Sequence, residues 1–95
     1  MTVYAMYWRH YCASKEEHES VEDAKSFTQW GESDGYLSTL GIVDTDNKIF
    51  YIDSIGGTLE DLYDGEIQDK IKEVKKEFGM DISDYKVETY DTFGD

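Results

Sequence analysis

Proline is absent from this chain, and cysteine occurs only once, at Cys12. A single cysteine cannot form a disulfide within the chain, so the cysteine usage gives no sign of an oxidising compartment. No stretch approaches the roughly 20 apolar residues that span a membrane. The first residues carry neither a basic leader nor the apolar run of a signal peptide. These absences predict a protein of the cytoplasm.

Basic residues are also scarce, because 9 Lys and Arg stand against 22 Asp and Glu and give a formal net charge of −13. Direct binding to nucleic acid or to an anionic membrane needs clustered Lys and Arg, so we expect neither. Aromatic residues make up 15% of the chain, whereas disordered acidic tails contain few. The 95 residues therefore predict one folded domain over 1–95.

The N-terminal third predicts a strand followed by a helix. Residues 2–11 favour a strand because Val, Tyr and Trp are dense there. Both faces of this strand are apolar, which is typical of a central strand. The polar and acidic residues 12–19 are expected to form a loop. Ser20 then fits the N-cap of a helix whose apolar side chains recur every three residues up to Trp30, and Gly31 is the expected end.

The middle of the chain predicts a hairpin and a second helix start. Residues 36–43 and 48–55 read as strands. The Asp-Thr-Asp-Asn sequence at 44–47 supplies turn residues between them, since Asp and Asn tolerate turn conformations. Thr58 fits the cap of a further short helical segment.

The C-terminal part predicts a helix and a final strand, which completes the fold class. Apolar residues over 67–78 are spaced by four, three and four positions, and Gly79 is the natural end of that helix. Residues 85–93 alternate as an edge strand. The order strand, helix, strand, strand, helix, strand predicts an α+β two-layer sandwich. Its ferredoxin-like, four-stranded antiparallel sheet would carry two helices on one face.

Acidic residues gather in three segments, and their excess needs a reason beyond solubility. A small domain needs a net charge of only about 2–8 to stay soluble, and further charge adds self-repulsion. The electric field of this negative charge would steer a basic protein surface towards the chain, so we expect such a surface as the partner. The residues expected to bind it are Glu16, Glu17, Glu19, Glu22, Asp23, Asp44, Asp46, Glu60, Asp61 and Asp64, with Trp8 and Trp30 as aromatic anchors. The lysines of 70–76 are expected to form a solvated helix end.

No motif for metal or catalysis stands out. His10, Cys12 and His18 are zinc-ligand types, but their spacing fits no standard zinc site and no nucleophile arrangement. The Asp-rich turn at 44–47 departs from the calcium-loop pattern in the positions that follow it. No phosphate-binding glycine loop is present, and the acids are expected on solvated surfaces. We therefore expect no enzyme, no cofactor and no metal.

Aromatic residues of the first strand leave two alternatives open. Tyr4, Tyr7, Trp8 and Tyr11 could be exposed on an open sheet face, where Arg9 adds positive charge. Such a face could let the protein self-associate as a structural or regulatory domain, so that it would be a homodimer rather than a monomer. It could also stack on bases of single-stranded nucleic acid, although the net charge opposes that.

In size, charge, aromatic content and lack of a catalytic motif, the chain resembles small acidic inhibitors encoded by phages, including anti-CRISPR and anti-restriction DNA mimics. The resemblance covers the composition of the whole chain and no residue-level motif. It implies a stoichiometric, non-enzymatic inhibitor in the cytoplasm of the host cell. Such an inhibitor would occupy the nucleic-acid site of a host defence protein.

Overall fold

The fold is α+β, with a five-stranded mixed sheet and two helices. The computed structural model describes residues 3–53 and 64–91, except for the side chain of Asp64. The sheet has the strand order β2-β1-β3-β4-β5, in which all neighbours are antiparallel except the parallel pair β4 and β5. The elements are β1 (Val3–Arg9), β2 (Cys12–His18), α1 (Val21–Ser33), β3 (Ser38–Asp44), β4 (Ile49–Asp53), α2 (Asp64–Phe78) and β5 (Lys86–Tyr90).

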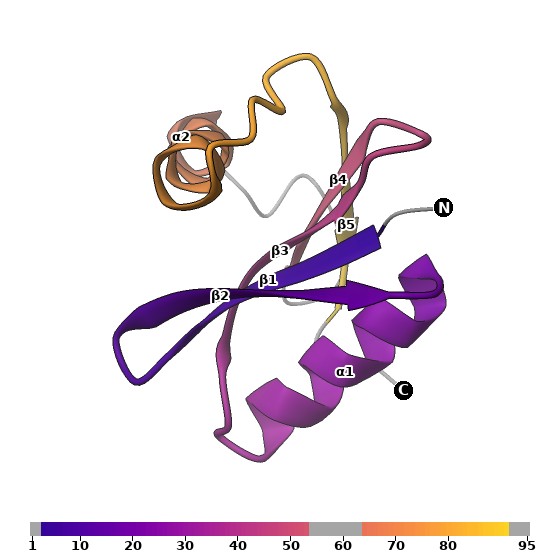
Figure 1. Ribbon diagram of the computed structural model, residues 1–95, viewed down its shortest axis with the longest axis vertical. Helices are drawn as coiled ribbons and strands as arrows, with labels where there is room; N and C mark the ends of the chain where they lie inside the picture. Colours follow the sequence, from indigo (N-terminus) through magenta and orange to yellow (C-terminus); the bar gives the residue numbers. More distant parts are fainter. Residues whose placement is uncertain (1–2, 54–63, 92–95) are drawn as a thin grey trace.

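The two helices lie on opposite faces of the sheet, which corrects the expectation of a two-layer, ferredoxin-like sandwich (Figure 1). Helix α1 connects β2 to β3, and α2 connects β4 to β5; within each pair the strands run parallel. Both connections advance across the sheet in the same direction, but β2 and β4 run in opposite directions. Because such crossovers are almost always right-handed, opposite strand directions place the two helices on opposite faces.

Alternate residues of the strands supply two separate cores. Val3 and Ala5 of β1 point to the α1 side, where they pack with Ala24. Met6 of β1 and Phe50 of β4 point to the α2 side. The apolar character of both faces of β1, and its central position, are therefore as expected.

Residues 12–18 form strand β2, so the expectation of a loop there was wrong. Arg9 pairs with Cys12, which leaves His10 and Tyr11 as a two-residue turn. Both turn residues have positive φ, 53° and 65°, and Asn-Gly is the usual sequence for such a turn. Strand β2 lies at the sheet edge and is mostly exposed, so neither its turn nor its side chains carry a strand signal.

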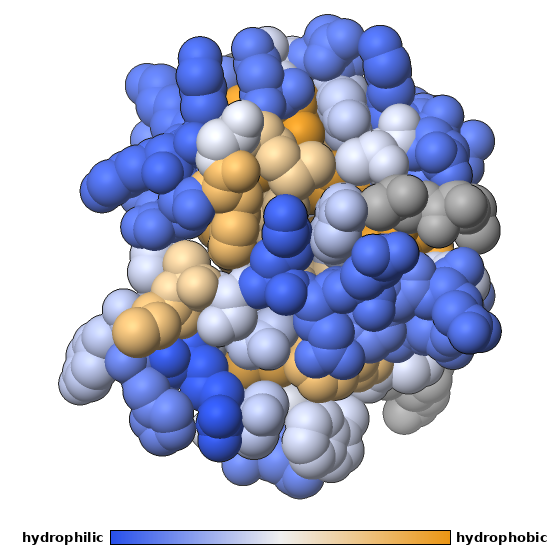
Figure 2. Space-filling model, in the orientation of Figure 1, coloured by the Kyte–Doolittle hydropathy of each residue, from blue (hydrophilic) through white to orange (hydrophobic). Residues whose placement is uncertain are grey.

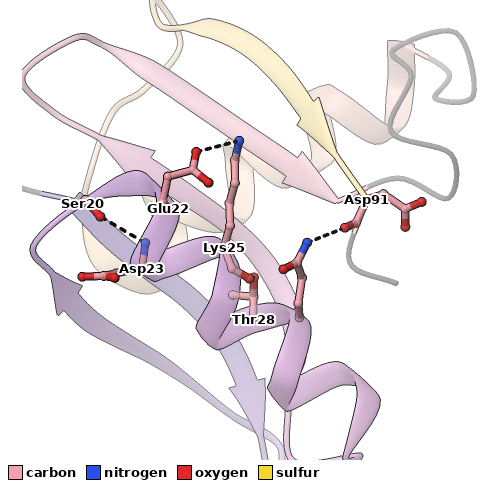
Figure 3. A network of polar contacts seen from close by, with 7 residues as sticks. Ser20, Glu22, Asp23, Lys25, Thr28 and Asp91 are labelled. Atoms are coloured by element: carbon pink, nitrogen blue, oxygen red, sulfur yellow. Dashed lines mark hydrogen bonds and ion pairs between the residues drawn. The ribbon is translucent and has the colours of Figure 1, made fainter. Parts of the chain in front are cut away.

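Helix α1 begins as expected but ends later. The backbone N–H of Asp23 donates to Ser20 Oγ at 3.1 Å, which is the predicted N-cap (Figure 3). Gly31 is buried inside the helix, and a Cβ there would lie 2.5 Å from side-chain atoms of Leu37. It therefore permits close packing rather than ending the helix. Gly35 takes the left-handed conformation just beyond the helix, with φ of 70°.

The remaining expectations are mostly confirmed. Helix α2 ends at Phe78, and Gly79 follows it in the left-handed conformation. Residues 44–47 connect β3 to β4, and β5 is an edge strand. The helical segment expected at Thr58 lies outside the described residues. In the described part of the chain, neither helix is long and apolar enough to cross a membrane.

Candidate functional site

Strand pairing brings two of the acidic segments to the same end of the sheet. Val3 of β1 pairs with His18 on one side and with Asp44 on the other. The end of β2, the start of α1 and the β3–β4 turn therefore meet at one end of the molecule (Figure 1). We call this the acidic end, and define it by the exposed carboxylates Glu17, Glu19, Glu22, Asp23 and Asp46.

Two lysines, Lys25 and Lys48, lie beside the acidic end. Lys25 Nζ lies 3.9 Å from a carboxylate oxygen of Glu22, whose side chain is 86% exposed (Figure 3). The same lysine lies over the ring of Tyr51, at 5.0 Å from its centroid. Lys48, in the β3–β4 turn, is 3.5 Å from Asp84. Glu22 and both members of the Lys48–Asp84 pair are exposed, so solvent screens these ion pairs and each holds little interaction energy.

Glu16 and Glu17 lie side by side on β2 and point to opposite faces of this edge strand. Residues of an antiparallel strand rise about 3.4 Å each, which is also the spacing of phosphate charges along one strand of B-DNA. Because successive side chains point to opposite faces, carboxylates on one face of β2 repeat only at about 6.8 Å, and Glu16 and Glu17 do not form one row. Lys15 precedes these carboxylates on β2, and its ammonium group lies 4.6 Å from the centroid of the Tyr4 ring.

Asp44 is not part of the acidic surface, which corrects the expectation that it binds a partner. It is only 1% exposed. Its carboxylate accepts hydrogen bonds from the backbone N–H groups of Asp46 and Asn47, both at 3.2 Å, and from the Asn47 side chain at 2.8 Å. This carboxylate therefore shapes the β3–β4 turn from inside.

The third acidic segment is placed only in part. Glu60 and Asp61 lie outside the described residues, as does the side chain of Asp64 at the start of α2. The lysines at 75 and 76 occupy the last turn of α2, where a cation suits the negative end of the helix dipole. Both are exposed, as expected.

The two expected aromatic anchors lie apart. Trp8 is half-buried against the core on the α2 side of the sheet. Trp30 projects from α1 on the other side and is 51% exposed. They cannot therefore act as one anchor on a flat partner.

Exposed aromatic side chains instead gather at the end of the sheet opposite the acidic end. The Trp30 ring lies 5.2 Å from the Tyr36 ring, and the Arg9 guanidinium carbon lies 3.9 Å from the Tyr36 ring centroid. Tyr11 is fully exposed at the tip of the β1–β2 hairpin. We call these four residues the aromatic end. Sequence patterns could not predict the Arg9–Tyr36 contact, because it depends on the pairing of β1 with β3.

A hollow of about 480 Å³ lies beside the hairpin tip, lined by Trp8, His10, Tyr11 and Ser38. Ser38 pairs with Trp8 across the β1–β3 ladder, which brings the start of β3 to the hairpin. The face seen in Figure 2 is mostly hydrophilic, with a band of apolar side chains between the region of α2 and the hairpin. The aromatic end therefore includes a concave surface beside the hairpin tip.

The zinc-ligand types are spread along the hairpin. His10 is in the turn, Cys12 is exposed at the start of β2, and His18 is at the far end of that strand. His18 packs against Phe27 and lies 3.6 Å from a carboxylate oxygen of Glu16. No group of three His, Cys, Asp or Glu side chains that could hold a metal occurs within 3–53 and 64–91.

Two groups with perturbed pKa values lie in the interior, away from the acidic end. Burial raises the pKa of Asp53, at the end of β4, although Lys70 at 3.8 Å favours its charged form. Burial also raises the pKa of Tyr90, whose hydroxyl is 2.8 Å from Thr28 Oγ1. Shifted pKa values occur at structural polar groups as well as at catalytic groups.

Comparisons with known proteins add no family: no family model matches the chain, and it has no significant similarity to a curated protein or to a solved structure. The residues of this chain's own surface are therefore what bears on its function.

Proposed function

We propose that this protein is a non-enzymatic inhibitor that binds a basic, nucleic-acid-binding surface of a partner protein through its acidic end. The observation that carries this proposal is the convergence of β2, the start of α1 and the β3–β4 turn at one end of the sheet. Carboxylates more than 20 residues apart in sequence, such as Glu22 and Asp46, lie at the same end of the sheet there. In keeping with the phage-inhibitor resemblance, the partner would be a host defence protein in the host cytoplasm.

A basic groove attracts anionic groups of any kind, carboxylates as well as phosphates. Lys and Arg bind carboxylates and phosphates through the same charge-assisted hydrogen bonds. Strand β2 presents the carboxylates of Glu16 and Glu17 on its two faces, so this sheet edge offers negative charge to either side. They are held on a strand paired with β1, so their spacing is fixed before binding. The net charge of −13 would also speed the approach of a basic partner.

The alternative, self-association through an open sheet face, has less support because helices lie on both sides of the sheet. Tyr4 and Trp8 pack against the α2-side core. Tyr7 packs edge-on against Phe27 of α1, at a ring distance of 5.4 Å. The tyrosines that would form that face are thus mostly engaged within the fold.

The proposal is tested by immobilising the protein, passing a bacterial lysate over it at low salt, and eluting with rising salt. We expect the retained proteins to bind nucleic acid and to release a labelled DNA oligonucleotide when this protein is added. Retention should fall steeply with salt, because each charge contact is screened.

Two variants of equal net charge make the test specific. Glu17→Gln, Glu19→Gln and Glu22→Gln remove three charges from the acidic end, and Asp69→Asn, Glu73→Gln and Glu77→Gln remove three from α2; both change −13 to −10. The first variant should weaken binding by about tenfold or more, mainly through slower association. The second should change it little. Equal weakening by both variants, or retention that resists salt, would refute the proposal.

A further inference from the structure

The aromatic end is a second surface that the acidic end does not explain. Tyr11, Trp30 and Tyr36 are the large hydrophobic side chains exposed in the described part of the chain, and all three lie at this end. The single arginine, Arg9, lies over one of their rings. Trp, Tyr and Arg are the residue types that most often dominate binding energy at protein interfaces.

The hairpin tip holds its aromatic ring at a cost to the fold. His10 and Tyr11 both have positive φ, a conformation that Gly, Asn and Asp adopt more readily than a bulky aromatic residue does. Tyr11 is fully exposed and recovers nothing by packing within the chain. The hairpin turn thus presents the Tyr11 ring to solvent from a backbone position that the strand pairing holds in place.

Strand β2 and helix α1 both run between the acidic end and the aromatic end. Strand β2 runs from Cys12, next to Tyr11, to His18 at the acidic end, while α1 runs back from Val21 to Ser33 and carries Trp30 in its last turns. Seven residues of strand and thirteen of helix each span about 20 Å. At about 3.4 Å per stacked nucleotide this equals roughly six nucleotides, which is within the site size of a single-strand-binding domain, roughly 4–16 nucleotides.

Building on the proposed function, we infer that the partner's surface is one that binds single-stranded rather than double-stranded nucleic acid. Sites for single strands combine a basic groove for the backbone with aromatic platforms on which bases stack. The acidic end would occupy the basic groove. The rings of Tyr11, Trp30 and Tyr36 would take the positions of unpaired bases. Duplex sites need phosphate contacts and readout of base edges, and stacked rings supply neither.

The test compares two competitors on the partner captured by the immobilised protein. A single-stranded oligo-dT and a duplex are each added at the same phosphate concentration. We expect the single strand to release the partner at a concentration about tenfold lower than the duplex. Equal release by both, or better release by the duplex, would overturn the inference while leaving the proposed function standing.

Variants of the rings give a second, independent readout. Tyr11→Gln and Trp30→Gln should each raise the dissociation rate, by about tenfold per ring lost, with little change in the salt dependence of association. Tyr11→Phe and Trp30→Phe keep a stacking ring and should retain most of the binding. If the Gln variants dissociate as slowly as the native protein, the aromatic end does not touch the partner and the inference fails. If the lysate yields no salt-sensitive partner at all, the proposed function itself fails.

Discussion

Buried polar side chains in this small protein shape the fold. Thr28 donates its hydroxyl hydrogen to the Lys25 carbonyl at 3.0 Å, so the Tyr90 hydroxyl donates to Thr28 at 2.8 Å. Asp44 plays a similar part in the β3–β4 turn, where three hydrogen bonds satisfy its carboxylate. Acidic residues that look alike in the sequence thus have different roles, because burial separates Asp44 from Asp46.

Replacing Tyr90 with Phe should destabilise the protein by about 1–2 kcal/mol at neutral pH, since a buried hydrogen bond is lost. Burial raises the pKa of Tyr90, so the neutral hydroxyl favours the folded state below the ordinary tyrosine pKa of about 10. This contribution is lost as pH rises above that value. Urea unfolding of both proteins across pH should therefore show a difference that narrows above about pH 10.

Tyr11→Phe is the control for that measurement, because the Tyr11 side chain is fully exposed. Its unfolding free energy should match that of the native protein at neutral pH. An unchanged stability in Tyr90→Phe would mean that the contact with Thr28 contributes nothing to the fold.

Some of the helices and strands could be predicted from sequence patterns, and others could not. Both helices follow from side-chain periodicity with local capping residues, Ser20 and Gly79, which act within one turn. Strand β2 could not be predicted, because an exposed edge strand needs no apolar alternation and its turn lacks Asn-Gly. The helix faces were also missed, since they depend on strand direction across the whole sheet.

The β1–β2 turn offers a test at this scale. Replacing His10 with Asn and Tyr11 with Gly supplies the residues that a turn with two positive φ values favours. We expect the double variant to be more stable by about 1 kcal/mol or more, which thermal unfolding would show as a rise of roughly 4–8 °C in Tm. A fall in Tm would show that these side chains stabilise the hairpin in some other way.

The described residues place the acidic end at one end of the sheet and the exposed rings of Tyr11, Trp30 and Tyr36 at the other. Composition predicted the charge, and clustering predicted which segments carry it. The sequence could not predict that β2 and the β3–β4 turn lie at the same end, because this depends on how β1 is paired in register with β2 and β3. The same register creates the contact of Arg9 with Tyr36.

Self-repulsion at the acidic end should make the stability depend on salt. Raising NaCl from about 0.01 M to about 1 M shortens the screening length from about 30 Å to about 3 Å, so we expect Tm to rise by several degrees. The variant with Gln at 17, 19 and 22 should show a smaller rise than the variant of equal charge on α2. Calorimetry over a salt series measures both, and a Tm that is flat or falls with salt would contradict the expectation.

Contacts between distant parts of the chain also set the order in which this protein can fold. Thr28 and Tyr90 are 62 residues apart, and so are Gln29 and Asp91, whose side-chain amide and backbone carbonyl meet at 2.9 Å (Figure 3). Such long-range contacts close late in folding, after local hairpins and helices. During synthesis, the segment from β1 to β4 can emerge from the ribosome with its hairpins paired while α1 still lacks these partners. Helix α1 therefore reaches its final packing only once β5 has been synthesised.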